Sequence, residues 1–250
     1  MCVGGIRRYE IEYNEKSNTE IGVLIKNRPK IPCPEYDYET IKIPGRDGEL
    51  YKELDSVSDI TISIDFTFAC EPYRWQAIAR NARKWIMKRG EGKLILSDNP
   101  DRYYKVKHVV VNETERQAKE VGEFTADFVC EGRQYLLEGE NPMELGFKSQ
   151  SGDYGERVLV WNPYDDSAPL YIVEGNGHFK MRVNGSHLDM DINGEMTLDT
   201  RREVAYKRDM SSANTLVTCN YRNMYLKAGE NVIEKTVGFN LKIIPRWREL

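Results

Sequence analysis

The segment 189–194 contains the residue types of a calcium site. It has the sequence Asp-Met-Asp-Ile-Asn-Gly, and calcium-binding helix-loop-helix signatures surround the ion with alternate oxygen ligands and a central glycine. Position twelve of such a loop would be Thr200 instead of a bidentate glutamate, and the flanking residues alternate like strands where helices are required. The segment therefore predicts a hairpin with Asp189 and Asp191 on its solvent face.

Histidines, cysteines and carboxylates are the other residues that could do chemistry. No nucleophile motif or paired Cys/His spacing accompanies any of the histidines, His108, His178 and His187. The cysteines are odd in number, widely spaced and without a Cys-x-x-Cys pair, which indicates reduced thiols: Cys2, Cys33, Cys70, Cys130 and Cys219. The 40 acidic residues offer no recognisable catalytic pair. We therefore expect no catalytic residue, no metal site, no cofactor and no enzymatic activity.

Alternating apolar and polar residues predict a sheet in the first half of the chain. Between residues 57 and 69 the apolar side chains fall on one face of a strand. Residues 122–131 repeat this pattern, and residues 103–111 are a third candidate strand. Together they predict several antiparallel strands.

A helix is predicted between residues 72 and 88, where apolar residues recur at spacings of three and four. Pro72 suits its first turn and Gly90 its end. The other face is basic and has no acid between Pro72 and Arg89; its residues are Arg74, Arg80, Arg83, Lys84 and Lys88. A solvated face or a subunit contact is the simplest interpretation of this patch, and contact with a passing nucleic acid is the alternative.

The segment 97–101, Ser-Asp-Asn-Pro-Asp, predicts a chain reversal between Leu96 and Tyr103. Asp, Asn and Ser bond back to their own backbone and proline presets φ, so such a cluster favours a turn. Farther on, residues 137–153 lose all periodicity and accumulate Gly and Ser together with Asn141 and Pro142, as connectors do. We therefore place a domain boundary between residues 137 and 138.

The second half is predicted to be all β. Short strands are expected at 158–161, 170–174, 179–183, 188–192, 196–198 and 237–244. Tight hairpin turns are expected at 175–177, 184–185 and 193–194, because Asn and Gly accept a positive φ. Such a pattern is most simply a β-sandwich that follows an α+β domain.

Composition restricts the function classes further. The chain has 250 residues, 40% of them hydrophobic, and a net charge of −4 with interspersed signs, so no global attraction to nucleic acid or an anionic membrane is expected. No window approaches 18 consecutive apolar residues and no signal peptide is recognised, so we expect synthesis in a cytosol and no membrane partner. Tyrosine and tryptophan are abundant; Tyr103, Tyr104 and Trp247 are either interface anchors or core residues.

An ordered set of motifs resembles one family. These motifs are Pro-Gly-Arg-Asp-Gly at 44–48, Ser-Asp-Asn-Pro-Asp at 97–101, Gly-Glu-Phe at 122–124, Ala-Gly-Glu-Asn at 228–231 and Pro-Arg-Trp-Arg-Glu-Leu at 245–250. With them the sequence resembles the distal tail (Dit) proteins of siphophages and prophages of Gram-positive bacteria, over nearly its whole length.

The resemblance implies a fold and an architectural role. Residues 1–137 would be a ring-forming domain of β-sheet with one helix and an extended hairpin, and residues 138–250 a galectin-like β-sandwich. Six copies would form a baseplate ring at the virion tail tip, assembled in the host cytoplasm, that joins the major tail protein to the tail-associated hub or lysin protein. DNA would pass through the ring as cargo, and the tape measure protein is a further possible partner.

Specific contacts and alternatives stay open at this point. Arg46 and Asp47 are expected either to form a charged turn or to pair across a subunit seam, and Arg80, Arg83 and Lys84 are the helix candidates for a subunit interface. The alternative function is a host cell-wall carbohydrate-binding module that uses the C-terminal sandwich. A hydrolase has the weakest support, because no nucleophile, base and orienting group can be named.

Overall fold

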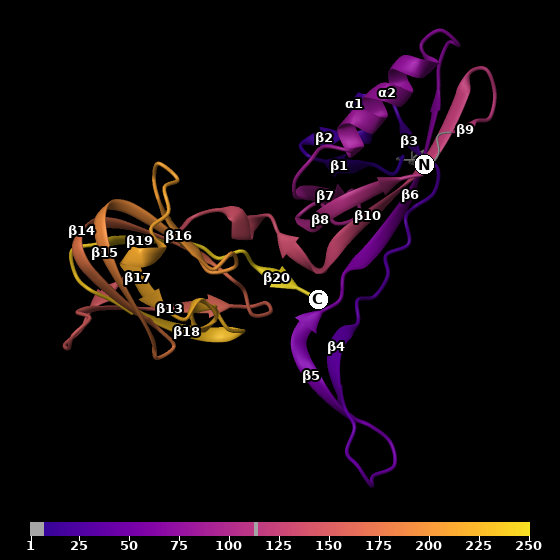
Figure 1. The fold of residues 1–250 in the computed structure, drawn as a ribbon. Helices are drawn as coiled ribbons and strands as arrows, with labels where there is room; N and C mark the ends of the chain where they lie inside the picture. Colours follow the sequence, from indigo (N-terminus) through magenta and orange to yellow (C-terminus); the bar gives the residue numbers. More distant parts are fainter. Residues whose placement is uncertain (1–7, 113–114) are drawn as a thin grey trace, which may run out of the picture. The chain divides into compact units, whose positions relative to one another are not determined.

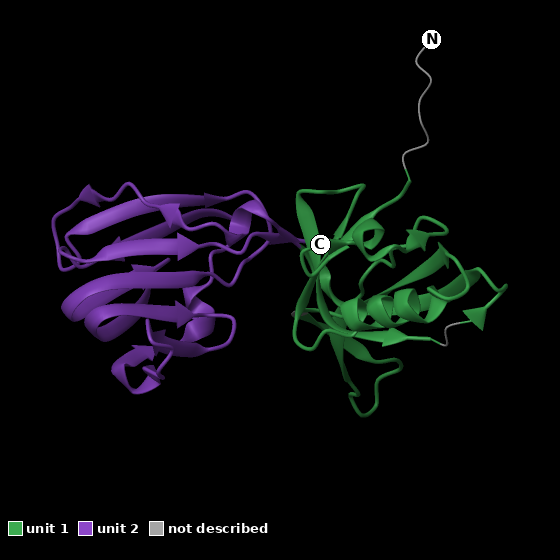
Figure 2. Ribbon diagram, turned by 90° about the horizontal axis from the view of Figure 1, so that it is seen from above, with its two compact units in different colours: residues 1–134, 250 green, residues 135–249 purple. Residues whose placement is uncertain are grey.

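The computed structural model describes residues 8–112 and 115–250, and the chain divides into two compact units (Figures 1 and 2). Unit 1 contains the described residues up to Gln134 together with Leu250, and unit 2 is Tyr135–Glu249. Each unit has its own cluster of buried hydrophobic residues. Among the described residues, no helix has both the length and the apolar character that a membrane crossing requires.

The core of unit 1 lies on one face of a mostly antiparallel sheet. Its strands are β1 (Ile11–Tyr13), β2 (Lys16–Ser17), β3 (Leu24–Ile25), β6 (Ile60–Ala69), β7 (Gly92–Leu96), β8 (Arg102–Val111) and β10 (Val121–Leu136), with β9 (Glu115–Arg116) paired to β10. The last two residues of β10 belong to unit 2, as does β20 (Arg248–Glu249), which also pairs with β10. The strand order is β2-β1-β7-β8-β10-β6-β3. The three strands expected in this half are confirmed, although β10 is longer than expected and a break at residues 58–59 separates β6 from β5 (Leu50–Val57).

The two longest paired strands of unit 1 show how alternation builds this sheet. On β6 every second side chain from Ile60 to Phe68 is buried, and Phe66 lies opposite Phe124 of β10 with stacked rings. On the other face hydroxyl groups lie opposite carboxylates. Ser63 donates to Asp127 and Thr125 donates to Asp65, each at 2.6 Å. This alternation keeps the carboxylates of neighbouring strands from lying directly opposite one another.

Helix α2 (Trp75–Ile86) packs its apolar stripe on this core, and Trp85 donates its indole N–H to the carbonyl of Tyr13 at 2.8 Å. The helix is shorter than the predicted 72–88, because residues 71–74 form a turn in which the Arg74 N–H bonds the Glu71 carbonyl. A second helix, α1 (Asn18–Ile21), was not expected. Its signal is a Ser-x-x-Glu capping box, in which Ser17 and Glu20 bond each other's backbone N–H groups.

A two-stranded hairpin separate from this sheet is formed by β4 (Tyr36–Ile41) and β5, and we call it the arm. Figure 1 shows it as a long ribbon that ends in a loop. The extended hairpin implied by the resemblance therefore corresponds to residues 36–57.

Unit 2 is all β apart from three 3-10 turns at Glu138–Glu140, Asn214–Leu216 and Tyr221–Met224. Its strands are β11 (Met143–Glu144), β12 (Lys148–Ser149), β13 (Glu156–Asn162), β14 (Leu170–Val183), β15 (Ser186–Asp199), β16 (Val204–Lys207), β17 (Val217–Cys219), β18 (Gly229–Lys235) and β19 (Asn240–Ile244). The order along its sheet is β11-β19-β14-β18-β13-β12, with β15 on the other edge of β14 and paired to β16 and β17.

The long hairpin β14–β15 corrects part of the sequence analysis. Segments 170–174 and 179–183 are one strand, and 188–192 and 196–198 are another, so 175–177 and 193–194 are not turns. They lie opposite each other, with Gly175 paired to Gly194. Residues before this point pair with β19 and residues after it pair with β18, so the glycines bend the hairpin between two sets of neighbours. The turn at 184–185 is confirmed, with positive φ at both residues.

Candidate assembly surfaces

The histidines, cysteines and carboxylates that could do chemistry are dispersed. Among residues 8–112 and 115–250, no three His, Cys, Asp or Glu side chains converge as a metal site. The calcium-like segment 189–194 lies within strand β15, so it is β structure as expected, but the hairpin does not turn at 193–194. Its two carboxylates flank one imidazole: His178 Nδ1 lies 2.8 Å from Asp191 and Nε2 lies 3.4 Å from Asp189.

The cysteines that the structure describes are unpaired thiols, and Cys2 lies outside the described residues. Cys33 is exposed and Cys130 is buried. Burial raises the pKa of the Cys130 thiol to about 12 and that of Cys219 to about 11. Because the thiolate is the reactive species, these two residues behave as small hydrophobic side chains at neutral pH.

The arm has many exposed apolar side chains. Tyr38 is 50% exposed and Tyr51 is 65% exposed, and their rings pack edge to face across the two strands. Further exposed residues of the same hairpin are Tyr36, Ile41, Ile43, Leu50 and Leu54. Two ion pairs, Lys42 with Glu49 and Lys52 with Glu39, join the strands. Isolated two-stranded hairpins are marginal in water, so this surface gains stability only if a partner covers it.

Arg46 and Asp47 lie in the tip of the arm, where the Arg46 N–H bonds the Ile43 carbonyl at 3.2 Å. Both are exposed, and within the described residues no ion pair joins them. The charged-turn interpretation of 44–48 therefore holds for the isolated chain. Their pairing across a subunit seam stays a prediction.

The basic face of α2 is the second candidate surface. Arg80, Arg83 and Lys84 are all exposed, and they have no ion pair in the described part of the chain. Next to this face is a cavity of about 460 Å³ between the two helices. Its lining includes Lys16, Lys84 and Lys88, with Glu20 as its acid. The predicted site residues thus occupy two separate elements, the arm tip and α2, and within the described residues no hydrogen bond or ion pair joins the two groups.

The turn 97–101 is a structural anchor. Asn99 N–H bonds the Leu96 carbonyl at 3.0 Å, and Ser97 exchanges bonds with Glu10 through its backbone and its hydroxyl. Asp98 pairs with Arg28 at 2.9 Å. Burial and the neighbouring Asp98 carboxylate raise the pKa of Tyr9 to about 12. The predicted reversal is confirmed, and its polar side chains tie β7 to the segment before β1.

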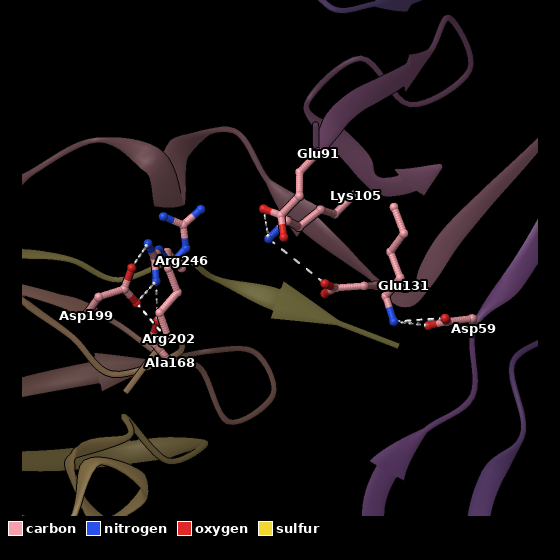
Figure 3. Close-up of polar contacts among 9 residues, drawn as sticks. Asp59, Glu91, Lys105, Glu131, Ala168, Asp199, Arg202 and Arg246 are labelled. Atoms are coloured by element: carbon pink, nitrogen blue, oxygen red, sulfur yellow. Dashed lines mark hydrogen bonds and ion pairs between the residues drawn. The ribbon is translucent and has the colours of Figure 1, made fainter. Parts of the chain in front are cut away.

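The C-terminal motif at 245–250 is also structural. Figure 3 shows Arg246 against Asp199, with two bonds of 2.8 and 3.1 Å between guanidinium and carboxylate. Asp199 also accepts the N–H groups of Arg201 and Arg202. Burial alone would raise the pKa of Asp199, but the Arg246 guanidinium and the two N–H groups outweigh it and hold that pKa below its usual value.

Lys105 is the second polar centre in Figure 3 and belongs to unit 1. Its ammonium group lies 2.6 Å from Glu91 and 4.0 Å from Glu131. The aromatic residues singled out in the sequence are core residues: Tyr103, Tyr104 and Trp247 are all buried. The exposed aromatic residues that the sequence analysis did not identify are Tyr36, Tyr38, Tyr51, Tyr73 and Trp161.

Comparisons with known proteins identify a family whose model matches part of the chain and a solved structure with a similar fold. Residues 16–130 match the family described as the phage tail protein RIFT-related domain. The fold resembles the crystal structure of SPP1 Dit, described as a paradigm of the hub adsorption apparatus in phages that infect Gram-positive bacteria. The TM-score is 0.69 at 12% identity, over 96% of this chain and 98% of that chain. No curated protein matches the sequence.

Proposed function

We propose that this chain is a phage tail protein that forms a ring, because residues 16–130 match the phage tail RIFT-related domain and the chain has a fold like that of SPP1 Dit. The ring has six members, forms part of the baseplate at the tail tip and works by shape instead of catalysis. It joins the tail tube to the tail-associated hub and leaves a passage for DNA. The observation that carries the proposal is the arm, a hairpin whose exposed apolar side chains have no covering partner within the described chain.

The arm and the basic face of α2 have complementary charge. Residues 36–57 contain six acidic and three basic residues, whereas residues 72–89 contain six basic residues and no acid. An arm that lies on α2 of the next copy would place opposite charges together and bury its tyrosines. Such a head-to-tail contact closes into a ring when the rotation from one copy to the next is a full turn divided by a whole number. Arg80, Arg83 and Lys84 are the receiving residues of this contact.

The partners of the ring follow from its position. We propose the major tail protein above it, the tail-associated hub or lysin protein below it, and the tape measure protein and DNA as occupants of its passage. Assembly takes place in the cytoplasm of the infected host. The comparisons do not favour the alternative, a carbohydrate-binding module in unit 2.

Two variants of the full chain test the ring. The first, Tyr38→Ser with Tyr51→Ser, removes the exposed rings of the arm; the second reverses charge at Arg80, Arg83 and Lys84 to Glu. Wild type should form a hexamer and show ring particles in electron micrographs. Both variants should stay folded, lose the ring and sediment as monomers at low concentration. Wild-type monomers at high concentration, or rings that survive the arm substitutions, would refute the proposal.

Matched controls separate a lost contact from general damage. Val237→Ser removes an apolar side chain that is 59% exposed and lies in unit 2, away from both the arm and α2. Reversal of three exposed charges of unit 2, at Lys180, Arg208 and Arg222, matches the helix variant in charge. Both controls should keep the ring. Mixing the arm variant with the helix variant should yield more heterodimer than either variant yields homodimer, because only the mixed pair brings an intact arm to an intact helix.

A further inference from the structure

Strand β13 has one edge that is mostly unpaired. On one side it pairs with β18 along its whole length, from Glu156 to Asn162. On the other side β12 covers only Glu156 and Arg157. Within the described chain, no residue from 158 to 161 has a further backbone or side-chain hydrogen bond on that side. Such an edge is a template for another strand.

The side chains along this edge lack the features by which proteins protect free edges. Residues 158–161 are Val-Leu-Val-Trp, without a charge, a proline or a bulge. Leu159 is 54% exposed and Trp161 is 67% exposed, while Val160 between them is buried in unit 2. Because alternate residues share a face, the leucine and the tryptophan form one apolar stripe beside the open backbone.

We propose that this edge pairs antiparallel with the same edge of a second copy, about a twofold axis at Val160. In that register Leu159 of each copy lies directly opposite Trp161 of the other, on the same face of the joined sheet. The twofold axis generates two equivalent Leu159–Trp161 contacts, and each of them is apolar. The joined strands end at Val158 and Asn162, because β12 occupies the edge beside Arg157, so no charged side chains meet within the pair.

The second copy is the occupant because the pattern is self-complementary. A twofold contact requires the same patch to fit itself, and here a large ring and a branched aliphatic side chain exchange places about the axis. The contact goes beyond the proposed ring, since its residues belong to unit 2 and not to the arm or α2. It joins two copies only, which would pair two rings or two isolated chains.

The test uses the full chain and separates this contact from the ring. In the arm variant Tyr38→Ser with Tyr51→Ser, sedimentation at increasing concentration should reveal a monomer–dimer equilibrium. Leu159→Lys with Trp161→Lys, added to that variant, should abolish the dimer. Val237→Lys, at a residue that is 59% exposed but not on this edge, should leave the dimer unchanged. If the arm variant keeps the ring, the lysine pair should instead halve the mass of any double ring.

A crosslink tests the register. Leu159→Cys and Trp161→Cys are placed on separate chains, each carrying Cys33→Ser to remove the exposed thiol. Oxidation of the mixture should join position 159 to position 161, identified by peptide mass, and either chain alone should crosslink far less. A protein that stays monomeric at its solubility limit, or a dimer that survives both lysines, overturns the proposal. Association only after a different tail protein is added also overturns it.

Discussion

At the scale of single residues, the buried ion pair Asp199–Arg246 holds the C-terminal segment of unit 2 in place. Asp199 is 2% exposed, so Asp199→Asn would leave the Arg246 charge without its partner in a low-dielectric site. We expect a loss of about 3 kcal/mol in the free energy of unfolding, measured by urea denaturation. The matched control is Glu203→Gln at an exposed pair with Arg222, 3.4 Å long, which should cost less than about 1 kcal/mol.

The same pair predicts a dependence on pH. The folded-state pKa of Asp199 lies below its usual value, so the unfolded chain binds the proton more readily. The stabilisation is therefore complete above the unfolded-state pKa of about 4 and is lost as the pH falls through the lower folded-state pKa. Urea titrations of wild type and Asp199→Asn should converge in stability toward acid pH. A constant difference between the two from neutral to acid pH would contradict this account.

The motif Gly122-Glu-Phe124 has a packing explanation at this scale. A Cβ at Gly122 would lie 2.3 Å from the ring of Phe68, which is fully buried on the neighbouring strand. Gly122→Ala should therefore destabilise unit 1 by about 1–3 kcal/mol through overpacking. Gly146→Ala is the control, because no atom lies within 4 Å of the added carbon. Equal thermal midpoints for the two variants would contradict the packing explanation.

At the scale of elements, the arm should be the first part of the free chain that a protease cuts. Its tip is exposed from residue 42 to 49, and it contains the trypsin sites Lys42 and Arg46. Loops with few buried contacts open at low cost, so we expect rapid cleavage there in the monomeric helix variant. Assembled rings should be cut at least tenfold more slowly, as measured by gel densitometry. Equal rates would indicate that the arm is not covered on assembly.

Sequence periodicity predicts the elements whose burial pattern is visible in the local sequence. It fails where pairing with a distant segment decides whether residues form a turn or a strand. The strands around Phe66 and Phe124 and the stripe of α2 bury alternate or helically spaced residues, so their pattern was readable. The glycines at 175, 177 and 194 were read as turns because they accept a positive φ. They instead bend one long hairpin, a choice set by pairing with β18 and β19 far along the chain.

The candidate surfaces were predictable only in part, for the same reason. The basic face of α2 follows from helical spacing alone, whereas the exposed aromatic residues of the arm look like core residues in the sequence. Tyr103 and Trp247 are the opposite case: the sequence allows either residue to be an exposed interface anchor, but both are buried by contacts that the sequence does not reveal. Whether an aromatic residue is an anchor or a core residue depends on what covers it, and local pattern carries no information on that.

At the scale of the whole molecule, two separate cores predict two unfolding steps. Units of this kind, each with its own buried cluster, melt independently unless a large interface couples them. Scanning calorimetry of the monomeric helix variant should resolve two transitions. In that background Gly122→Ala should lower the midpoint of one and Asp199→Asn the midpoint of the other, because the two residues lie in different clusters. If either substitution lowers both midpoints together, the two units unfold as one cooperative body. A destabilising substitution in one unit would then also weaken assembly through surfaces of the other unit.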